Sequence, residues 1–251
     1  MKPLMDRTVI VTGAAQGIGA CLAQGLAGAG ANVVVADVLD GEAVVADISR
    51  TGGQAIAATT DITSDESLAA MMEQARDSFG TVDILVNNAA LFGTLPLTPL
   101  DEISLEDWDQ VMRVNVRGPW QCVKAVLPDM KAKKEGSIIN IATNRVYMGF
   151  PNMLHYDASK GAVVAMTKAM ATELGAYNIR VNGVAPGLTL SENVLRKEGI
   201  GERNAIISAS RALARSQQPE DLVGAVLFFA GPHSDFISGQ TLIVDGGGIM
   251  N

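Results

Sequence analysis

The chain has 251 residues, a length that suits one large domain, and 48% of them are hydrophobic, enough to form a sizeable core. Its net charge of −8 argues against nucleic acid or an anionic membrane surface as the main partner. No apolar stretch reaches the roughly 18 residues that a membrane span requires, so we expect a cytoplasmic protein with no membrane partner.

Apolar runs alternate with helical segments along the chain. The expected strands lie at residues 8–12, 32–36, 54–58, 82–86, 137–141, 179–184 and 240–244. The expected helices lie at residues 17–29, 41–50, 65–79, 104–130, 156–175 and 220–229. The strands are rich in Val and Ile and hardly alternate with polar residues, which is typical of a sheet buried on both faces. This pattern predicts βαβ units and a single α/β domain over residues 1–251, with a Rossmann-like, doubly wound parallel sheet flanked by helices.

Two segments, 91–101 and 188–218, have little periodicity, and each follows an expected strand. Ligands in open α/β sheets bind outside the carboxyl ends of the strands. Both segments are therefore candidate walls or lids of a binding site, with plain surface loops as the alternative. We expect the second to be a substrate-loop insertion.

A glycine-rich loop follows the first expected strand and opens the first expected helix. Gly13, Gly17 and Gly19 have the spacing G-x3-G-x-G. Gly13 can adopt backbone angles barred to other residues, Gly17 would let the backbone approach a pyrophosphate, and Gly19 would let the helix pack on the strand. The free N–H groups and the dipole at the helix start favour a phosphate. The predicted dinucleotide contacts of this loop are Thr12, Gly13, Gln16, Gly17, Ile18 and Gly19.

An acidic residue, Asp37, ends the second expected strand, 18 residues after Gly19. A carboxylate about 20 residues beyond the glycine loop binds the adenosine ribose hydroxyls, and it would repel the 2′-phosphate of NADP. No Arg or Lys lies between Gly13 and Asp37 to offset that repulsion, so NAD is the predicted cofactor. Asp61 ends the third strand and could accept a hydrogen bond from adenine, or be an N-cap or turn residue. The neighbouring positions Val38 and Ile62 are expected to contact the same end of the cofactor.

Tyr156 and Lys160 stand four residues apart in the helix expected at 156–175, so they share one face. An isolated tyrosine has a pKa near 10 and is a poor base at neutral pH. A nearby ammonium favours the phenolate and would lower that pKa. Tyr156 is therefore a candidate general base for an oxidation and general acid for a reduction.

Several motifs occur in the order in which the short-chain dehydrogenase/reductase family carries them, and the sequence resembles that family over essentially its whole length. These motifs are the glycine loop, Asn87-Asn88-Ala89-Ala90, Asn115, Tyr156 with Lys160, Pro186-Gly187 and Val244-Asp245-Gly246-Gly247. The resemblance implies an alcohol dehydrogenase or ketoreductase that acts on CH–OH donors. It also implies a homotetramer in which the helices at 104–130 and 156–175 pack between subunits.

The resemblance further implies roles for individual residues. Asn88, Ala89 and Ala90 should line the cofactor. Asn115 should hold a water that links Lys160 to solvent, and Lys160 should bind the nicotinamide ribose. The remaining residues expected to contact the cofactor are Tyr156, Pro186, Gly187, Leu188, Thr189 and Ser191.

The sequence departs from the family pattern at two positions. Ala90 stands where the family has glycine, which adds one methyl group beside the cofactor. Thr143 stands 13 residues before Tyr156, where the family has its catalytic serine. Threonine keeps a hydroxyl that can hydrogen-bond the substrate oxygen, although its β-branching restricts χ1 and its methyl group crowds the pocket. We expect Thr143 to act as the substitute; the alternatives are a weakened enzyme or a neighbouring hydroxyl that takes the same role.

Residues after Thr143 and before Tyr156 are expected to shape the substrate pocket. Arg145 could bind an anionic or polar group, or form an ion pair, and Met153 could form an apolar wall or belong to the core. This region resembles that of bacterial family members acting on aryl carbinols and cyclic hemiacetals, so a small aryl or cyclic secondary alcohol is the expected substrate. The two histidines and two cysteines lack metal-ligand spacing, so no metal is expected.

Three alternatives remain open. A sugar or cyclic hemiacetal dehydrogenase shares the same motifs. A 3-oxoacyl-carrier-protein reductase shares the fold but normally prefers NADPH and meets an acidic carrier, which Asp37 and the net acidity disfavour. A dinucleotide-binding sensor without activity is the non-enzyme alternative; Thr143 favours it, whereas Tyr156 and Lys160 oppose it.

Overall fold

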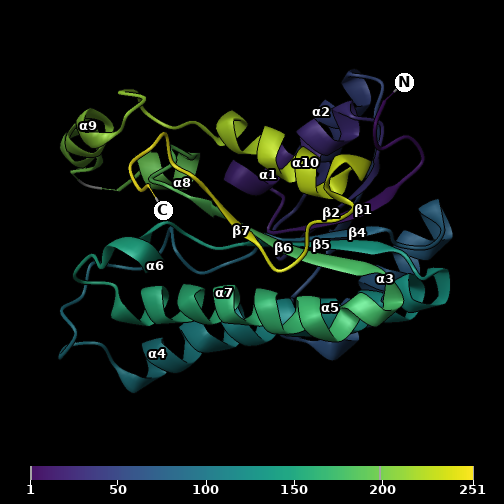
Figure 1. Cartoon of the computed structure of the whole chain (residues 1–251), viewed down its shortest axis with the longest axis horizontal. Coiled ribbons are helices and arrows are strands. Elements are labelled where there is room, and N and C mark those ends of the chain that lie inside the picture. Colours follow the sequence, from purple (N-terminus) through teal and green to yellow (C-terminus); the bar gives the residue numbers. More distant parts are fainter. Residues whose placement is uncertain (1, 198, 251) are drawn as a thin grey trace.

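A parallel β-sheet forms the centre of the molecule (Figure 1). The computed structural model describes residues 2–197 and 199–250, so Met1, Asn251 and Glu198, which fall within the predicted domain and insertion, lie outside the described residues. Within those described ranges, seven strands pair in the order β3-β2-β1-β4-β5-β6-β7. The strands are β1 (Thr8–Thr12), β2 (Asn32–Asp37), β3 (Gln54–Thr59), β4 (Ile84–Asn87), β5 (Gly136–Ile141), β6 (Ile179–Pro186) and β7 (Thr241–Val244). This single-domain, doubly wound sheet confirms the predicted fold.

Helices cover both faces of the sheet, with α1, α2 and α10 on one face and α3, α5 and α7 on the other (Figure 1). The side chains of Val9 and Val11 on β1 pack into the first core, and that of Ile10 packs into the second. Successive side chains of a strand point to opposite faces, so an uninterrupted apolar run serves both cores. The helices are α1 (Gly17–Gly28), α2 (Glu42–Arg50), α3 (Asp65–Phe79), α4 (Leu105–Met112), α5 (Gly118–Lys133), α6 (Arg145–Met148), α7 (Leu154–Leu174), α8 (Glu192–Leu195), α9 (Ile200–Ser210) and α10 (Val223–Ala230).

The strand order reverses between β1 and β4. From β1 the chain proceeds to β2 and β3 on one side, and from β4 it proceeds to β5, β6 and β7 on the other. Connections that leave adjacent strands in opposite directions open a crevice at the carboxyl ends of those strands. The fold therefore places a binding site beside the loops that follow β1 and β4.

The helix expected at 104–130 is interrupted. It consists of α4 and α5, joined by a π-helical turn, η1 (Arg113–Arg117), in which the N–H of Gly118 donates to the carbonyl of Arg113. Pro119 has no N–H and cannot make the α-helical hydrogen bond to the carbonyl of Asn115, four residues earlier. Such turns are frequent at functional sites, and this one carries Asn115.

Other boundaries also differ from expectation. The segment expected to be irregular at 188–218 contains α8 and α9; no residue of α9 is fully buried, which explains why its sequence lacks an apolar period. The helix expected at 220–229 begins as a 3-10 turn, η3 (Pro219–Leu222). The fourth strand starts at Ile84 instead of Val82, whose N–H donates to the Asp129 carboxylate.

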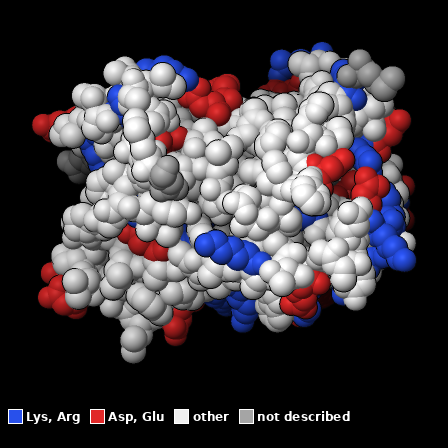
Figure 2. All heavy atoms as spheres, viewed as in Figure 1, with Lys and Arg blue, Asp and Glu red and all other residues white. Residues whose placement is uncertain are grey.

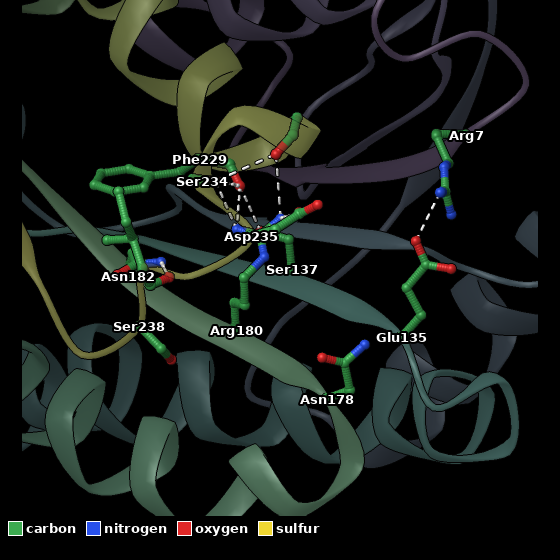
Figure 3. A network of polar contacts seen from close by, with 12 residues as sticks. Arg7, Glu135, Ser137, Asn178, Arg180, Asn182, Phe229, Ser234, Asp235 and Ser238 are labelled. Carbon is green, nitrogen blue, oxygen red and sulfur yellow. Dashed lines mark hydrogen bonds and ion pairs between the residues drawn. The ribbon is translucent and has the colours of Figure 1, made fainter.

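At the amino ends of β5 and β6, a polar network ties α10 and the turn after it to the sheet (Figure 3). Arg180 Nη1 donates to the Phe229 carbonyl at 2.8 Å and lies 2.7 Å from Ser234 Oγ. Ser137 Oγ donates to the same Phe229 carbonyl at 2.9 Å. These polar groups lie around a small cavity of about 310 Å³ and form hydrogen bonds with one another. The network therefore stabilises this end of the sheet.

On the face drawn in Figure 2, acidic and basic side chains are interspersed and do not form separate patches of one charge. Over residues 2–197 and 199–250, no helix combines the length and the apolar character needed to cross a bilayer.

Candidate active site

A cavity of about 1400 Å³ opens at the carboxyl ends of the central strands. It is lined by the glycine loop, by the segments that follow β2, β3 and β4, and by residues of α6, α7 and α9. Of the residues predicted from sequence as catalytic, cofactor-binding or substrate-binding, all but Thr12 and Asn115 line this one cavity. The structure therefore brings together side chains from distant parts of the chain.

The glycine loop is packed too closely for larger residues. Gly13 has a φ of +63°, and a Cβ added there would lie 2.7 Å from Ala89 Cα. A Cβ on Gly19 would lie 2.0 Å from the carbonyl oxygen of Gly13. Asn88 Nδ2 donates to the carbonyls of Thr12 and Gly13, each at 2.9 Å. Glycine is thus required by the close approach of the loops after β1 and β4.

Thr12 supports this loop from below and does not line the cavity, and its contact with a cofactor stays a prediction. The side chain is buried, and its hydroxyl accepts the N–H groups of Asn88 and Ala89, each at 3.1 Å. It also donates to the Val86 carbonyl at 3.3 Å. This hydroxyl therefore links the loop after β1 to the loop after β4.

The start of α1 fits a pyrophosphate. Gln16 precedes the helix, and its side chain does not cap the helix N–H groups. Gly17 has a φ of +59°, and a Cβ there would meet Ser191 Cβ at 3.4 Å, so a side chain would narrow the space between the two walls. Uncapped N–H groups and the helix dipole together favour a phosphate at this position.

Asp37 and Asp61 both line the cavity, but the structure gives them different surroundings. Asp37 is buried, and its two carboxylate oxygens accept the N–H groups of Ala15 and Leu39, at 2.9 and 3.0 Å. The Asp61 carboxylate accepts both the N–H and the hydroxyl of Thr63 at 2.8 Å, and these bonds hold its pKa below the usual value. One oxygen of the Asp61 carboxylate, Oδ1, thus makes the contacts of a turn residue, and a hydrogen bond from adenine to this carboxylate stays a prediction.

Tyr156 and Lys160 lie on α7, are both buried, and line the cavity together. Burial raises the pKa of the Tyr156 phenol, and this outweighs the opposing effects of the Arg145 guanidinium and the Thr143 hydroxyl. Burial also lowers the pKa of Lys160 to about 8. This corrects the expectation that Lys160 lowers the phenol pKa: in the protein alone, burial dominates and the cation that opposes it is Arg145. At neutral pH the phenol holds its proton.

Hydrogen bonds to neighbouring groups fix the side chains of Lys160 and Asn115. Lys160 Nζ donates to the Ile141 carbonyl at 2.7 Å. Asn115 Oδ1 accepts the Leu91 N–H at 2.8 Å, and its Nδ2 lies 3.1 Å from Ser159 Oγ. Hydrogen bonds within the protein therefore hold the Asn115 side chain, and its contact with a water stays a prediction.

Thr143 follows β5, lines the cavity, and is only 7% exposed. Its hydroxyl accepts the Arg145 N–H at 3.3 Å and lowers the pKa of the Tyr156 phenol by hydrogen bonding. A hydroxyl close to the phenol can hydrogen-bond the same substrate oxygen. Thr143 thus has the placement that the missing serine would need.

Thr143→Ser is expected to retain turnover, whereas Thr143→Ala is expected to lose about 10²-fold or more in kcat, because only the second variant removes the hydroxyl. Steady-state kinetics of both variants on the same alcohol check this. Equal rates in the two variants would eliminate the hydroxyl as a catalytic group.

Arg145 and Met153 line the cavity but are less available than predicted. Arg145 forms an ion pair with Asp157, with Nε and Nη2 at 2.7 and 2.8 Å from the two carboxylate oxygens, so its charge is already balanced. The ion pair was the expected alternative to a free anion-binding arginine. Met153 is 2% exposed, as a core residue at the cavity wall would be.

Several cavity residues were not predicted from sequence, and three of them bear on the chemistry of the site. Phe92 packs against the catalytic ring, with ring centroids 4.9 Å apart for Phe92 and Tyr156. Lys197 and Arg203 line the wall formed by α9 and the turn before it. All three fall in or next to the segments flagged as possible walls, but no spacing distinguishes them from other loop residues.

Comparison with known proteins is consistent with this geometry. A family model described as enoyl-(acyl carrier protein) reductase matches residues 13–248. The chain is 35% identical over 246 residues to a 5-keto-D-gluconate 5-reductase of Escherichia coli K12, covering 97% of this chain and 96% of that one. It is 37% identical over 257 residues to a 3-oxoacyl-[acyl-carrier-protein] reductase of Synechocystis sp. and 34% identical over 253 residues to a cyclopentanol dehydrogenase of Comamonas sp., each alignment covering 100% of both chains.

Among solved structures, a short-chain type dehydrogenase/reductase from Mycobacterium marinum superimposes with a TM-score of 0.89 at 30% identity, covering 99% of this chain and 97% of that one. The fold and the site define an oxidoreductase that acts on CH–OH donors and uses a nicotinamide dinucleotide. The chain belongs to the short-chain dehydrogenase/reductase family.

Proposed function

We propose that the protein uses NAD to interconvert a small secondary alcohol, aryl or cyclic, and its ketone. The observation that carries this proposal is the meeting of Tyr156, Lys160 and Thr143 in the cavity that the glycine loop also lines. The apolar walls around them include Phe92, Phe150, Met148 and Met153, which suit a ring-bearing substrate.

Each residue has a distinct part in the reaction. The bound nicotinamide accepts or supplies the hydride. The Tyr156 hydroxyl gives its proton to the ketone oxygen in reduction and takes it back in oxidation. The Thr143 hydroxyl holds that same oxygen in place, and Lys160, fixed by the Ile141 carbonyl, would bind the nicotinamide ribose of the cofactor. Phe92 covers the phenol and helps to exclude water.

The preference for NAD over NADP is proposed from the position of Asp37. Asp37→Ala is expected to shift the ratio of kcat/KM for NAD against NADP by at least about tenfold toward NADP, because a carboxylate near the 2′-phosphate costs several kcal/mol. Asp37→Asn serves as the matched variant, since it removes the charge while an amide oxygen can still accept from Ala15 or Leu39. An unchanged ratio in both variants would remove Asp37 from the cofactor site.

The experiment that tests the proposed function is NADH formation across a panel of aryl carbinols, cyclic alcohols and polyols. Relatives named for cyclopentanol and for 5-keto-D-gluconate justify including both cyclic alcohols and sugar derivatives. Turnover on ring-bearing secondary alcohols supports the proposal. NAD binding without turnover on any alcohol would favour a dinucleotide sensor.

A second candidate function is reduction of 3-oxoacyl groups on a carrier protein, which the Synechocystis relative favours. Asp37 and the net charge of −8 oppose it, because the first disfavours NADPH and the second repels an acidic carrier. A 3-oxoacyl thioester with NADPH belongs in the same panel. Faster turnover on that substrate than on any alcohol would replace the first candidate.

We also propose, by analogy with the family, that the protein is a homotetramer. Apolar side chains on the helices expected to pack between subunits are exposed in the single chain, among them Leu105 on α4, Trp120 on α5 and Leu154 on α7. Light scattering of the purified protein would measure the mass directly.

A further inference from the structure

Three cations converge on one wall of the cavity. Arg145 lies on α6, Lys197 follows α8 and Arg203 lies on α9, and all three line the cavity. They are close enough to repel one another: Arg203 and Arg145 add to the burial that lowers the pKa of Lys197, and Arg145 adds to the burial that lowers the pKa of Arg203. Such a cluster of like charges is unfavourable unless an anion balances it.

Only part of this positive charge is balanced within the described ranges of the chain. Arg145 is neutralised by Asp157. Lys197 Nζ donates to the carbonyls of Phe92 and Leu95, at 3.0 and 3.1 Å, which are uncharged acceptors. Neither Lys197 nor Arg203 forms an ion pair with any carboxylate among residues 2–197 and 199–250. Two positive charges thus face the cavity.

The cluster borders the catalytic phenol. Lys197 Nζ lies 4.7 Å from the centre of the Phe92 ring, and that ring centre lies 4.9 Å from the centre of the Tyr156 ring. Asp37, by contrast, is hydrogen-bonded to the glycine loop through the Ala15 N–H. The Lys197 ammonium is therefore separated from the phenol by about one aromatic ring, and Arg203 lines the same cavity.

We propose that Lys197 and Arg203 form a carboxylate-binding subsite, so that the substrate is a secondary alcohol or ketone with a carboxylate beyond the ring that carries the reacting carbon. A guanidinium matches a carboxylate in shape and can bind it through two parallel hydrogen bonds, while an ammonium adds a compact charge. The apolar walls beside the cluster lower the local dielectric and strengthen the attraction. This inference rests on the proposed function for the reacting group but adds the charge of the substrate.

Equilibrium binding tests the subsite without requiring turnover. Calorimetry on the protein saturated with oxidised NAD, which cannot reduce a ketone, would compare 4-acetylbenzoate with 4-methylacetophenone, a ketone of similar shape without the charge. We expect the carboxylate to bind at least about tenfold more tightly than the uncharged ketone. Added salt should weaken the binding of the carboxylate only. Arg203→Met should reduce the preference to about twofold or less, and Arg203→Lys should restore part of it.

Arg196→Met is the matched control, because Arg196 is exposed, adjoins Lys197 in sequence, and does not line the cavity. Arg196→Met should keep the full preference for the carboxylate over the uncharged ketone. All variants should bind NAD as tightly as the unmodified protein does. Equal affinity for the two ketones, or a preference that survives Arg203→Met combined with Lys197→Met, would overturn the subsite. Carboxylate binding without any turnover would instead count against the proposed function and leave the subsite supported.

Discussion

Tyr156→Phe is expected to bind NAD with near-native affinity and to lose about 10²- to 10⁴-fold in kcat, the usual contribution of a general acid–base group. The change removes one oxygen and leaves the ring, so the contact between the rings of residues 156 and 92 should persist. Because burial keeps the phenol protonated at neutral pH, this hydroxyl is positioned as the proton donor in the reductive direction. Stopped-flow or steady-state measurement of NADH oxidation with a ketone gives the rate.

The affinity for NAD, measured by calorimetry, is the control for that variant, since it separates lost chemistry from a damaged cofactor site. A kcat within a fewfold of the native value would show that another group transfers the proton. Loss of NAD binding together with turnover would mean that the phenol holds the cofactor and would not identify the proton donor.

Lys160→Met is expected to lose most turnover and yet to stabilise the fold at pH 7. Burial lowers the pKa of Lys160 from an ordinary 10.5 to about 8, so at pH 7 the ammonium is charged in both the folded and the unfolded chain, and the folded chain bears the cost of burying it. At 1.36 kcal/mol per pKa unit, and allowing for the lost hydrogen bond to the Ile141 carbonyl, the gain is about 1–2 kcal/mol.

The size of this stabilisation depends on pH. As the pH rises above about 8, the folded chain loses the proton first and the cost of burial fades, so the advantage of Lys160→Met should shrink by alkaline pH. Urea unfolding of both proteins at neutral and at alkaline pH measures the difference. A variant that is less stable than the native protein at pH 7 would show that the Lys160 ammonium contributes more through its contacts than burial costs.

The sheet could be predicted from sequence because its signal is local. Runs such as Val9-Ile10-Val11 are apolar throughout, and their neighbours in the sheet have to be parallel strands covered on both faces. The interruption in the long helix was missed because Asn115 and its neighbours continue the helical pattern; Pro119, which cannot donate to the Asn115 carbonyl, was the available signal. Helix α9 was missed because it buries no residue fully and so has no apolar face to detect.

Some parts of the site could also be predicted from sequence, and others could not. The glycine loop and the pair Tyr156 and Lys160 have fixed spacings on predictable elements, so their meeting in one cavity could be anticipated. The support that the Thr12 hydroxyl gives to the loop after β4 could not be predicted, because a sequence does not show on which side of a loop a hydroxyl lies. Lys197 and Arg203 reach the cavity through the course of the chain after β6, which depends on tertiary packing and not on spacing.

The most direct test of hydride transfer uses 1-phenylethanol deuterated at its carbinol carbon, incubated with the protein and NAD. We expect mass spectrometry to find deuterium on the reduced nicotinamide, one atom for each ketone formed, and expect Tyr156→Phe to slow its appearance by about 10²-fold or more. Ketone formation without deuterium on the nicotinamide would contradict direct hydride transfer from the carbinol carbon.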